Sequence, residues 1–450
     1  MPEQPAASTR DQTQTSVVLL GADGVWALTA PFGAPAAAVP TALFQCPHAY
    51  AAIDVDFFAP LPLVIDANAD GLDDFFLPGL QMHCLALQQS DGTFTLQSLQ
   101  QRLPVTLLMP PFERAQLSFD LAPLPLVVDL NGDGRTDLLQ GSNAAVGYFL
   151  QQSDGSFHRV AQPLPLPVTL AGSERQIRQF KQLSRYQFER FEDINRDGVP
   201  DLLLKHQQYG EDLQDSVAQL KIWYGAFAGV DATVVPAEAS KNGDGGRADT
   251  TSVQAGRTQT SQVAQTSAAL QLSFSGTPAV LDLPGELVSL QFADFNGDRR
   301  LDASLLSAEL GAGSLMSALM GNGVALDIRL YPQQADGRFA KRAVASYETT
   351  YTLDVANTNI GVVFSTAHFN ADNAADLLFL NDHQQLQLMQ GSGNSRLSSK
   401  PQRLQAELPD RLQWISVLDI EQDGIAELLL RHLQPNGQLA LQLVRLVSAD

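Results

Sequence analysis

The sequence of 450 residues is poor in basic residues, in aromatic residues and in cysteine. Its 28 lysines and arginines stand against 49 acidic residues, so the formal net charge is −21. A surface with this excess of acid is unsuited to phosphate groups, which excludes nucleic acid and disfavours an anionic membrane surface. Two cysteines are too few for a disulfide-dense scaffold. No apolar run reaches the roughly 18 residues that a membrane-spanning helix needs, so we predict no transmembrane segment.

Two features of the chain stay open at this point. Cys46 and Cys84 either pair in an oxidising compartment or remain two buried thiols. Residues 1–14 are polar and predict a disordered segment in which no signal peptide is visible. The excess of negative charge also calls for an explanation of where the acidic residues lie and what neutralises them.

What the chain does contain is a repeat. The segment APLPLV begins at Ala59 and again at Ala122, 63 residues later, and LQQSDG begins at Leu87 and at Leu150 with the same offset. An acidic nine-residue core recurs six times, at 66–74, 129–137, 193–201, 294–302, 368–376 and 419–427, which we call loops one to six. The chain is therefore an array of related units, with insertions and deletions between them.

The flanks of each loop predict β-structure. Short apolar runs enter and leave the loops, and Ser-Asp-Gly or Ala-Asp-Gly turns typical of hairpins follow further on. Four short antiparallel strands per unit, repeated at this period, are typical of an all-β propeller. We predict one β-propeller over residues 15–450, with seven blades favoured and six possible. Either the N-terminal hairpin completes the last blade, or a seventh blade without the acidic core lies between loops three and four.

Two insertions interrupt the repeat. Residues 237–267 are rich in glycine, serine, threonine and glutamine, which predicts a flexible surface loop. A second insertion at about 311–327 forms either a short helix or a loop packed over one face.

The acidic core predicts a calcium site. Oxygen side chains at positions 1, 3 and 5 converge when the chain curls around a cation, position 7 adds a backbone carbonyl, and position 9 returns a carboxylate. An EF-hand would need glutamate at position 12 and flanking helices; position 12 is never acidic here, and strands flank the loops. Asx turns without metal are the alternative, but a turn alone does not require several mutually repelling carboxylates.

The copies differ in completeness. Loops one to three are complete, loop four has Arg299 in place of the glycine at position 6, and loop five has His368 at position 1, which puts metal binding in His368–Asp376 in doubt. The predicted metal ligands are Asp66, Asn68, Asp70, Leu72 and Asp74; Asp129, Asn131, Asp133, Arg135 and Asp137; Asp193, Asn195, Asp197, Val199 and Asp201; Asp294, Asn296, Asp298, Arg300 and Asp302; and, with longer side chains, Asp419, Glu421, Asp423, Ile425 and Glu427.

At these residues the chain resembles the FG-GAP or VCBS repeat family, the propellers related to the N-terminal domain of integrin α-subunits. The resemblance covers essentially residues 15–450 and is carried by D-x-N-x-D-G-x-x-D, complete in loops one to three. It implies a seven-bladed propeller with Ca²⁺ in the blade loops and an extracellular or periplasmic setting. Clear FG and GAP segments are missing. Members of the family include adhesion modules, lectin-like binders and lyases, so the fold does not name the ligand.

No catalytic motif is present. The adjacent residues His83 and Cys84 are a weak indication of a metal site. Arg185, Tyr186 and Arg190 are candidate catalytic groups of a lyase, although a structural role is favoured for them. We therefore expect a non-enzymatic, calcium-binding scaffold for adhesion or binding, with a protein or glycan ligand at one propeller face. The alternative is a carbohydrate-active propeller, either a lectin or a polysaccharide lyase.

Overall fold

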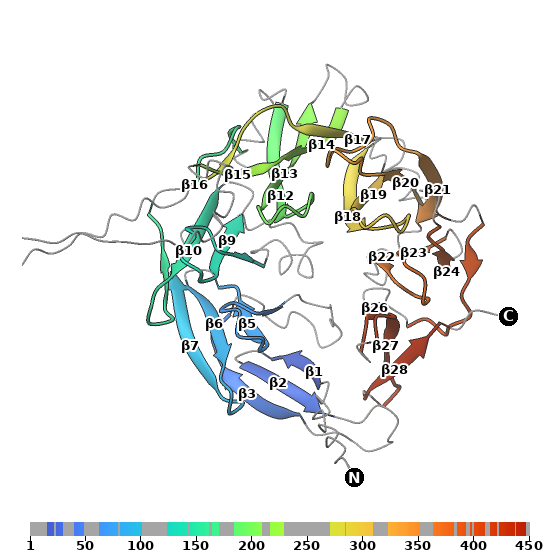
Figure 1. Cartoon of the computed structure of the whole chain (residues 1–450). Helices are drawn as coiled ribbons and strands as arrows, with labels where there is room; N and C mark the ends of the chain where they lie inside the picture. The colour runs from blue at the N-terminus through green and yellow to red at the C-terminus, as the bar shows by residue number, and fades with distance from the viewer. Residues whose placement is uncertain are drawn as a thin grey trace, which may run out of the picture.

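A computed structural model of the chain shows a ring of seven antiparallel sheets (Figure 1). It describes residues within 16–29, 40–48, 63–100, 124–170, 184–208, 217–228, 271–308, 323–351, 363–409 and 415–446, apart from short gaps inside these ranges. Every regular element among the described residues is a β-strand, and in this part of the chain no helix could span a membrane. The prediction of a seven-bladed, all-β propeller is confirmed.

The first three blades lie in chain order. The first blade contains β1 (Ser16–Leu20), β2 (Gly24–Thr29) and β3 (Thr41–Gln45). The second contains β4 (Val64–Ile65), β5 (Asp74–Leu77), β6 (Met82–Gln88) and β7 (Phe94–Gln100). The third contains β8 (Leu126–Val128), β9 (Asp137–Gly141), β10 (Val146–Gln151) and β11 (Phe157–Arg159).

The fourth blade contains β12 (Ser184–Glu192), β13 (Asp201–Gln208), β14 (Val217–Trp223) and β17 (Ala279–Leu283), and carries a ribbon of β15 (Gly225–Ala228) and β16 (Gln271–Phe274). The fifth contains β18 (Glu286–Ala293), β19 (Asp302–Ala308), β20 (Val324–Tyr331) and β21 (Ala345–Tyr351). The sixth contains β22 (Phe364–Ala367), β23 (Asp376–Leu380), β24 (Leu386–Met389) and β25 (Gln402–Arg403), and the seventh β26 (Ile415–Leu418), β27 (Glu427–Leu433) and β28 (Leu439–Arg445).

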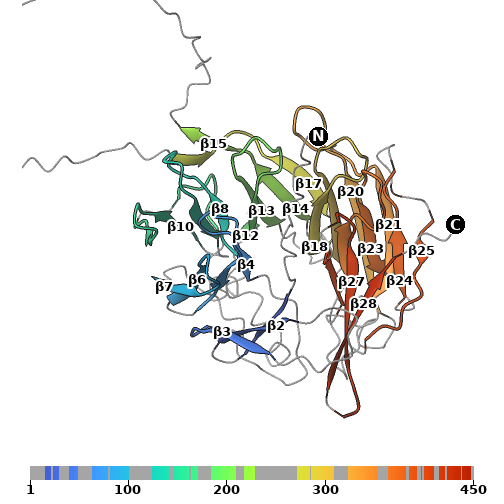
Figure 2. The same ribbon diagram turned by 60° about the horizontal axis from the view of Figure 1, so that its bottom comes forward.

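The hydrophobic core lies between the blades. The second strand of a blade is covered on both faces by its neighbours, which is why β9, β19 and β23 are buried along their whole length. After its first residue β23 reads as a continuous apolar run. The strands β9 and β19 also bury polar side chains, among them Gln140, Ser304 and Ser307. Four clusters each fill the gap between two successive blades, and a fifth runs on from the fifth blade through the sixth to the seventh. Figure 2 shows the sheets standing beside one another around the axis of the ring.

The seventh blade is not where we expected it. The residues between loops three and four do not form a separate blade, because β14 pairs with β17 to complete the fourth blade. The strands β15 and β16 form a two-stranded ribbon, and Leu272 and Phe274 of β16 pack on the core between the third and fourth blades. The additional blade is the N-terminal one, β1–β3. The N-terminal hairpin pairs with β3, and the described part of the last blade has three strands.

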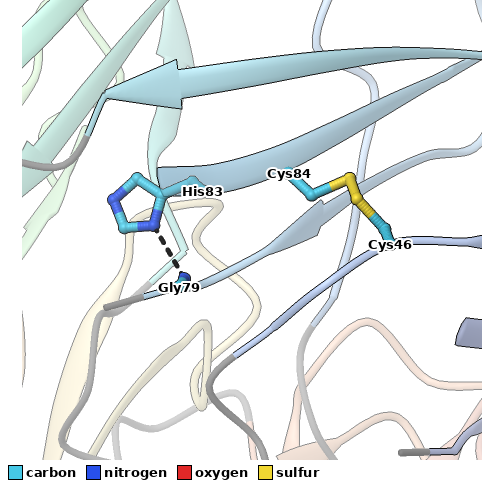
Figure 3. The surroundings of a disulfide bond; sticks show 4 residues. All are labelled: Cys46, Gly79, His83 and Cys84. Carbon is cyan, nitrogen blue, oxygen red and sulfur yellow. Dashed lines mark hydrogen bonds between the residues drawn. A yellow bond between two sulfur atoms is a disulfide. The ribbon is translucent and has the colours of Figure 1, made fainter. Parts of the chain in front are cut away.

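A disulfide joins the first two blades. Cys46 follows β3 and Cys84 lies in β6, and their sulfur atoms are bonded, which resolves the alternative that the sequence left open (Figure 3). Residues 1–14, the insertion at 237–267 and most of the insertion at 311–327 lie outside the described residues, whereas Val324 already belongs to β20.

Candidate metal centres

Each acidic loop connects the first strand of a blade to its second strand. Loops one to six therefore belong to the second to seventh blades, and position 9 is in every case the first residue of the second strand. Because all six blades are traversed in the same direction around the ring, the loops lie on the same face of the propeller. The prediction that position 9 brings a carboxylate to the start of a strand is confirmed.

Neighbouring loops touch, in three pairs through the residue at position 8 and in one pair through the residue at position 4. The Thr136 hydroxyl donates to the Ala67 carbonyl at 2.7 Å, which joins loop two to loop one. The Ala375 N–H donates to the Asp294 carbonyl at 2.6 Å, and the Ala426 N–H donates to the His368 carbonyl at 2.7 Å. The guanidinium of Arg196 in loop three donates to the Arg299 carbonyl in loop four at 2.8 Å. Four of the five successive pairs are thus in direct contact, so the loops form a belt on one ring face.

Positions 1 and 3 point into the curl of each complete loop. In loop one the Asp70 N–H donates to Asp66 Oδ1 at 3.1 Å and to Asn68 Oδ1 at 3.2 Å, so both oxygens face the same amide. The Gly71 N–H donates to Asp66 Oδ2 at 3.0 Å. Loops two, three and four repeat the pattern through Asp129, Asp193 and Asp294. The side-chain oxygens of positions 1 and 3 therefore face the same amide, and the metal binding predicted for them stays a prediction.

Loops five and six depart from this pattern. Position 1 of loop five is His368, whose Nδ1 lies 3.1 Å from the Ala374 carbonyl and supplies no carboxylate. Loop six keeps the contacts of position 1, because Asp419 accepts hydrogen bonds from the Asp423 and Gly424 N–H groups at 3.1 and 2.8 Å. Glu421 lies outside the described residues.

The curl requires two left-handed residues in each complete loop. Position 6 has positive φ in loops one to four: Gly71, Gly134 and Gly198 have φ near 80°, and Arg299 has φ 69°. Position 4 is left-handed as well, as Ala69 (φ 56°) and Arg196 (φ 58°) show. We predicted the demand at position 6 from the glycine pattern, but not the demand at position 4. Side chains in this conformation cost on the order of 1 kcal/mol each.

Position 9 ties the loop to the rest of the blade. Asp137 is fully buried, and its Oδ2 accepts the Leu130 N–H at 2.9 Å while its Oδ1 accepts the Gln151 N–H at 2.8 Å. One carboxylate thus joins position 2 of its own loop to the end of the third strand. Asp74, Asp201, Asp302 and Asp376 make the same two contacts. This structural role at position 9 was not predicted from the sequence.

Burial perturbs these carboxyl groups. It raises the pKa of Asp137 and Asp302 to about 6 and that of Asp201 to about 7, and repulsion from the aspartates at positions 1 and 5 acts in the same direction. The two backbone N–H donors oppose the rise in pKa in each case. An additional positive charge in the loop would favour the ionised form.

The residue types fit a hard cation such as Ca²⁺. Carboxylate and amide oxygens at positions 1 and 3 already face one interior point, and each oxygen at position 9 keeps lone-pair capacity beyond its single N–H donor. Among the described residues, however, no group of three or more His, Cys, Asp or Glu side chains is gathered closely enough to hold a metal ion. The chain thus supplies the donors and the curl, and filling a loop would require its carboxylates to draw together.

The other candidate residues have structural roles. His83 is fully buried and accepts the Gly79 N–H on Nδ1 at 3.1 Å, and Cys84 is in the disulfide, so the pair is not a metal site (Figure 3). Tyr186 stacks on His206 on the side of the third blade. Arg190 donates to the Leu290 carbonyl of the fifth blade at 2.7 Å. A bulge between Phe188 and Arg190 puts Tyr186 and Arg190 on opposite faces of the sheet, and Arg185 Nε donates to Gln207 Oε1.

Residues 129–204 match the FG-GAP-like repeat, a span that begins at loop two and ends just beyond loop three. No curated protein matches the chain significantly. Among solved structures, an Agrocybe aegerita lectin that recognises non-reducing terminal N-acetylglucosamine is similar at 10% identity and a TM-score of 0.44, over 96% of this chain and 82% of the lectin. A Lactobacillus plantarum protein is similar at 12% identity and a TM-score of 0.37, over 97% and 93% of the two chains.

A third similar structure is the Bacillus licheniformis rhamnogalacturonan lyase, at 11% identity and a TM-score of 0.31, over 95% of this chain and 66% of the lyase. Similarities at these scores do not bear on function. The repeat match and the ring of sheets agree with the family resemblance found in the sequence. The chain is thus a seven-bladed β-propeller in which residues 129–204 form an FG-GAP-like repeat.

Proposed function

We propose that the protein is a non-enzymatic, calcium-binding propeller that acts outside the cytoplasm as a binding or adhesion scaffold. The observation that carries this proposal is the belt of acidic loops on one ring face. In loops one to four, positions 1, 5 and 9 are all aspartate, and the side-chain oxygens of positions 1 and 3 face the same amide. Calcium, when bound, would place two positive charges among these carboxylates.

The chain's own residues then turn ion binding into a fixed surface. The position 9 carboxylates hold each loop to its blade, and the contacts of position 8 hold it to the neighbouring loop. A belt of this kind presents a rigid face on which a protein or glycan partner could dock. The disulfide between Cys46 and Cys84 supports a location outside the cytoplasm, because such bonds persist in oxidising compartments.

Chelation tests the metal proposal. We expect EDTA to lower the melting temperature of the full chain markedly and added Ca²⁺, but not equimolar Mg²⁺, to restore it, because Mg²⁺ demands a smaller and more regular coordination shell. The double variant Asp66→Ala with Asp70→Ala should reproduce part of the EDTA effect. Identical melting curves in EDTA and in Ca²⁺ would refute the proposal.

A cleft between the fifth and sixth blades favours carbohydrate binding as the second candidate function. Its volume is about 570 Å³, and it is lined by Tyr347 and Thr349 of β21 and by Asn381 and Gln387 from the sixth blade, among others. The size is in the range of small-ligand sites, and an aromatic ring beside neutral amides and hydroxyls suits a neutral sugar.

A glycan array separates the two candidate functions. Binding that is lost in Gln387→Ala would support the carbohydrate candidate. Gln442→Ala is the matched control, because Gln442 occupies the corresponding register in the last blade, opposite Leu430 as Gln387 is opposite Phe379. Unsaturated products released from uronate polymers would identify a lyase instead. The absence of glycan binding, together with retained calcium dependence, would leave the protein-binding scaffold.

A further inference from the structure

In three of the six loops, the aspartate at position 5 is paired with a guanidinium group. Arg135 pairs with Asp133 in loop two, and Arg300 pairs with Asp298 in loop four. In loop six the charge comes from outside the loop, because Arg445 of β28 reaches Asp423 at 2.5 Å. In each case the guanidinium contacts Oδ2, the carboxylate oxygen that does not accept the N–H of position 7.

These arginines are held in place by the blade. Arg135 Nε donates to the Gln151 carbonyl at 3.2 Å, and Arg300 Nε donates to the Gln333 carbonyl at 3.1 Å. Gln151 and Gln333 are also the residues whose N–H groups bind the carboxylates at position 9. Arg445 Nη1 lies 3.9 Å from Glu427, which is position 9 of loop six. Two different elements thus bring a positive charge to the same place, between position 5 and the third strand.

Loops one and three have no such charge. Position 7 is Leu72 in loop one and Val199 in loop three, and among the described residues no guanidinium or ammonium group pairs with Asp70 or Asp197. On Oδ2 each of these aspartates accepts, within the described part of the chain, only the amide of the asparagine at position 3, at 2.8 Å, whereas Asp133 of loop two accepts both this amide and the guanidinium. Arg196 of loop three points away to the Arg299 carbonyl and adds its charge to loop four instead.

We propose that these arginines are built-in counter-ions that decide which loops depend on calcium; this rests on the calcium-binding function proposed above. Loops one and three need the ion, whereas loops two, four and six are held together by the guanidinium and bind calcium more weakly. A unit positive charge roughly 4 Å from a dication opposes its binding by about tenfold or more, even in water. Loop five belongs to neither group, because His368 replaces the aspartate at position 1.

Calcium titration of the chelator-treated full chain by isothermal calorimetry tests this assignment. The wild type should show two tighter sites and a weaker class. Arg135→Leu, which gives loop two the position 7 residue of loop one, should add a third tight site with an affinity gain of about tenfold. The reciprocal Leu72→Arg should leave one tight site. Arg403→Leu, which removes an exposed arginine of β25 in another blade, controls for net charge and should change neither class.

Thermal unfolding gives a second measurement that does not depend on site counting. In EDTA, Arg135→Leu should melt below the wild type and regain the difference on addition of Ca²⁺, while Leu72→Arg should show a smaller response to Ca²⁺ than the wild type. Unchanged affinity classes in both variants, or an equal change in Arg403→Leu, would overturn the counter-ion assignment while calcium binding itself stands. No binding in the wild type or in any variant would overturn the calcium proposal as well.

Discussion

Replacing Asp137 by asparagine separates the structural role of position 9 from metal binding. Asparagine keeps one side-chain oxygen but places an NH₂ group where the second oxygen accepted a backbone N–H. The Leu130 or the Gln151 N–H, both bound at 2.8–2.9 Å in the wild type, then loses its acceptor in a fully buried place. A lost charge-assisted bond of this kind and a buried donor without a partner cost about 2–4 kcal/mol together.

The same loop offers a matched control. The Asp133 side chain is 27% exposed and paired with Arg135, so Asp133→Asn should cost no more than about 1 kcal/mol when metal is removed. With an unfolding entropy of about 2.1 cal/mol/K per residue over 450 residues, each kcal/mol lowers the melting temperature by about 1 °C. In EDTA we therefore expect a fall of about 2–4 °C for Asp137→Asn and of about 1 °C or less for Asp133→Asn.

Calorimetry in EDTA and in Ca²⁺ provides the measurement, and hydrogen exchange provides a local one. The amides of Leu130 and Gln151 should exchange faster in Asp137→Asn and at the wild-type rate in Asp133→Asn. In Ca²⁺ both variants should lose stability, since both remove a carboxylate from the loop. Equal melting temperatures for the two variants in EDTA would refute the role assigned to position 9.

Three further predictions follow from the loops and from the disulfide. The carboxyl groups of Asp137, Asp201 and Asp302 have folded-state pKa values of about 6 to 7, above the ordinary value of 3.8, so the folded chain binds more protons than the unfolded chain between about pH 4 and 7. The free energy of unfolding in EDTA should therefore fall as the pH rises through this window and change less in Ca²⁺; a stability that rises with pH in denaturant titrations would contradict this. The backbone of Arg299 is left-handed (φ 69°), so Arg299→Gly should raise the free energy of unfolding in EDTA by about 0.5–1 kcal/mol. Arg338→Gly is the control, because the backbone of Arg338 is not left-handed and the same substitution there should give no such gain. Cys46→Ala with Cys84→Ala opens a 38-residue loop and should cost about 4 kcal/mol in the chain-entropy treatment, with a loss under 1 kcal/mol arguing against that account.

The fold could be predicted because its signals repeat. A period of about 63 residues, hairpin turns and apolar runs around each loop are local patterns, and their recurrence in phase indicates a ring of sheets. The place of the seventh blade could not be predicted in this way. The strands β1–β3 lack the acidic loop, and whether a hairpin pairs with β3 or with β28 depends on distant backbone edges rather than on its own sequence.

Within the candidate site, the contacts inside each loop could be predicted from the sequence, whereas the contacts with distant strands could not. Positions 1 and 3 behave as their residue types suggest, because short oxygen side chains act within their own turn. The second contact of position 9 lies 14 residues away in Asp74 and in Asp137 and 31 residues away in Asp302, so no local pattern reveals it. Arg445 lies 22 residues beyond Asp423, and only the pairing of β27 with β28 brings the two together.

The first blade is held to the ring by a different kind of link from the others. It contains no acidic loop, and a covalent bond from Cys46 to Cys84 joins it to the second blade. With the calcium sites proposed above, the propeller would respond to two separate features of its surroundings. Thiol reductants would act on the N-terminal junction, whereas the concentration of divalent cations would act on the belt of loops in the six later blades. A protein built in this way would report whether it has reached a compartment that is both oxidising and rich in calcium.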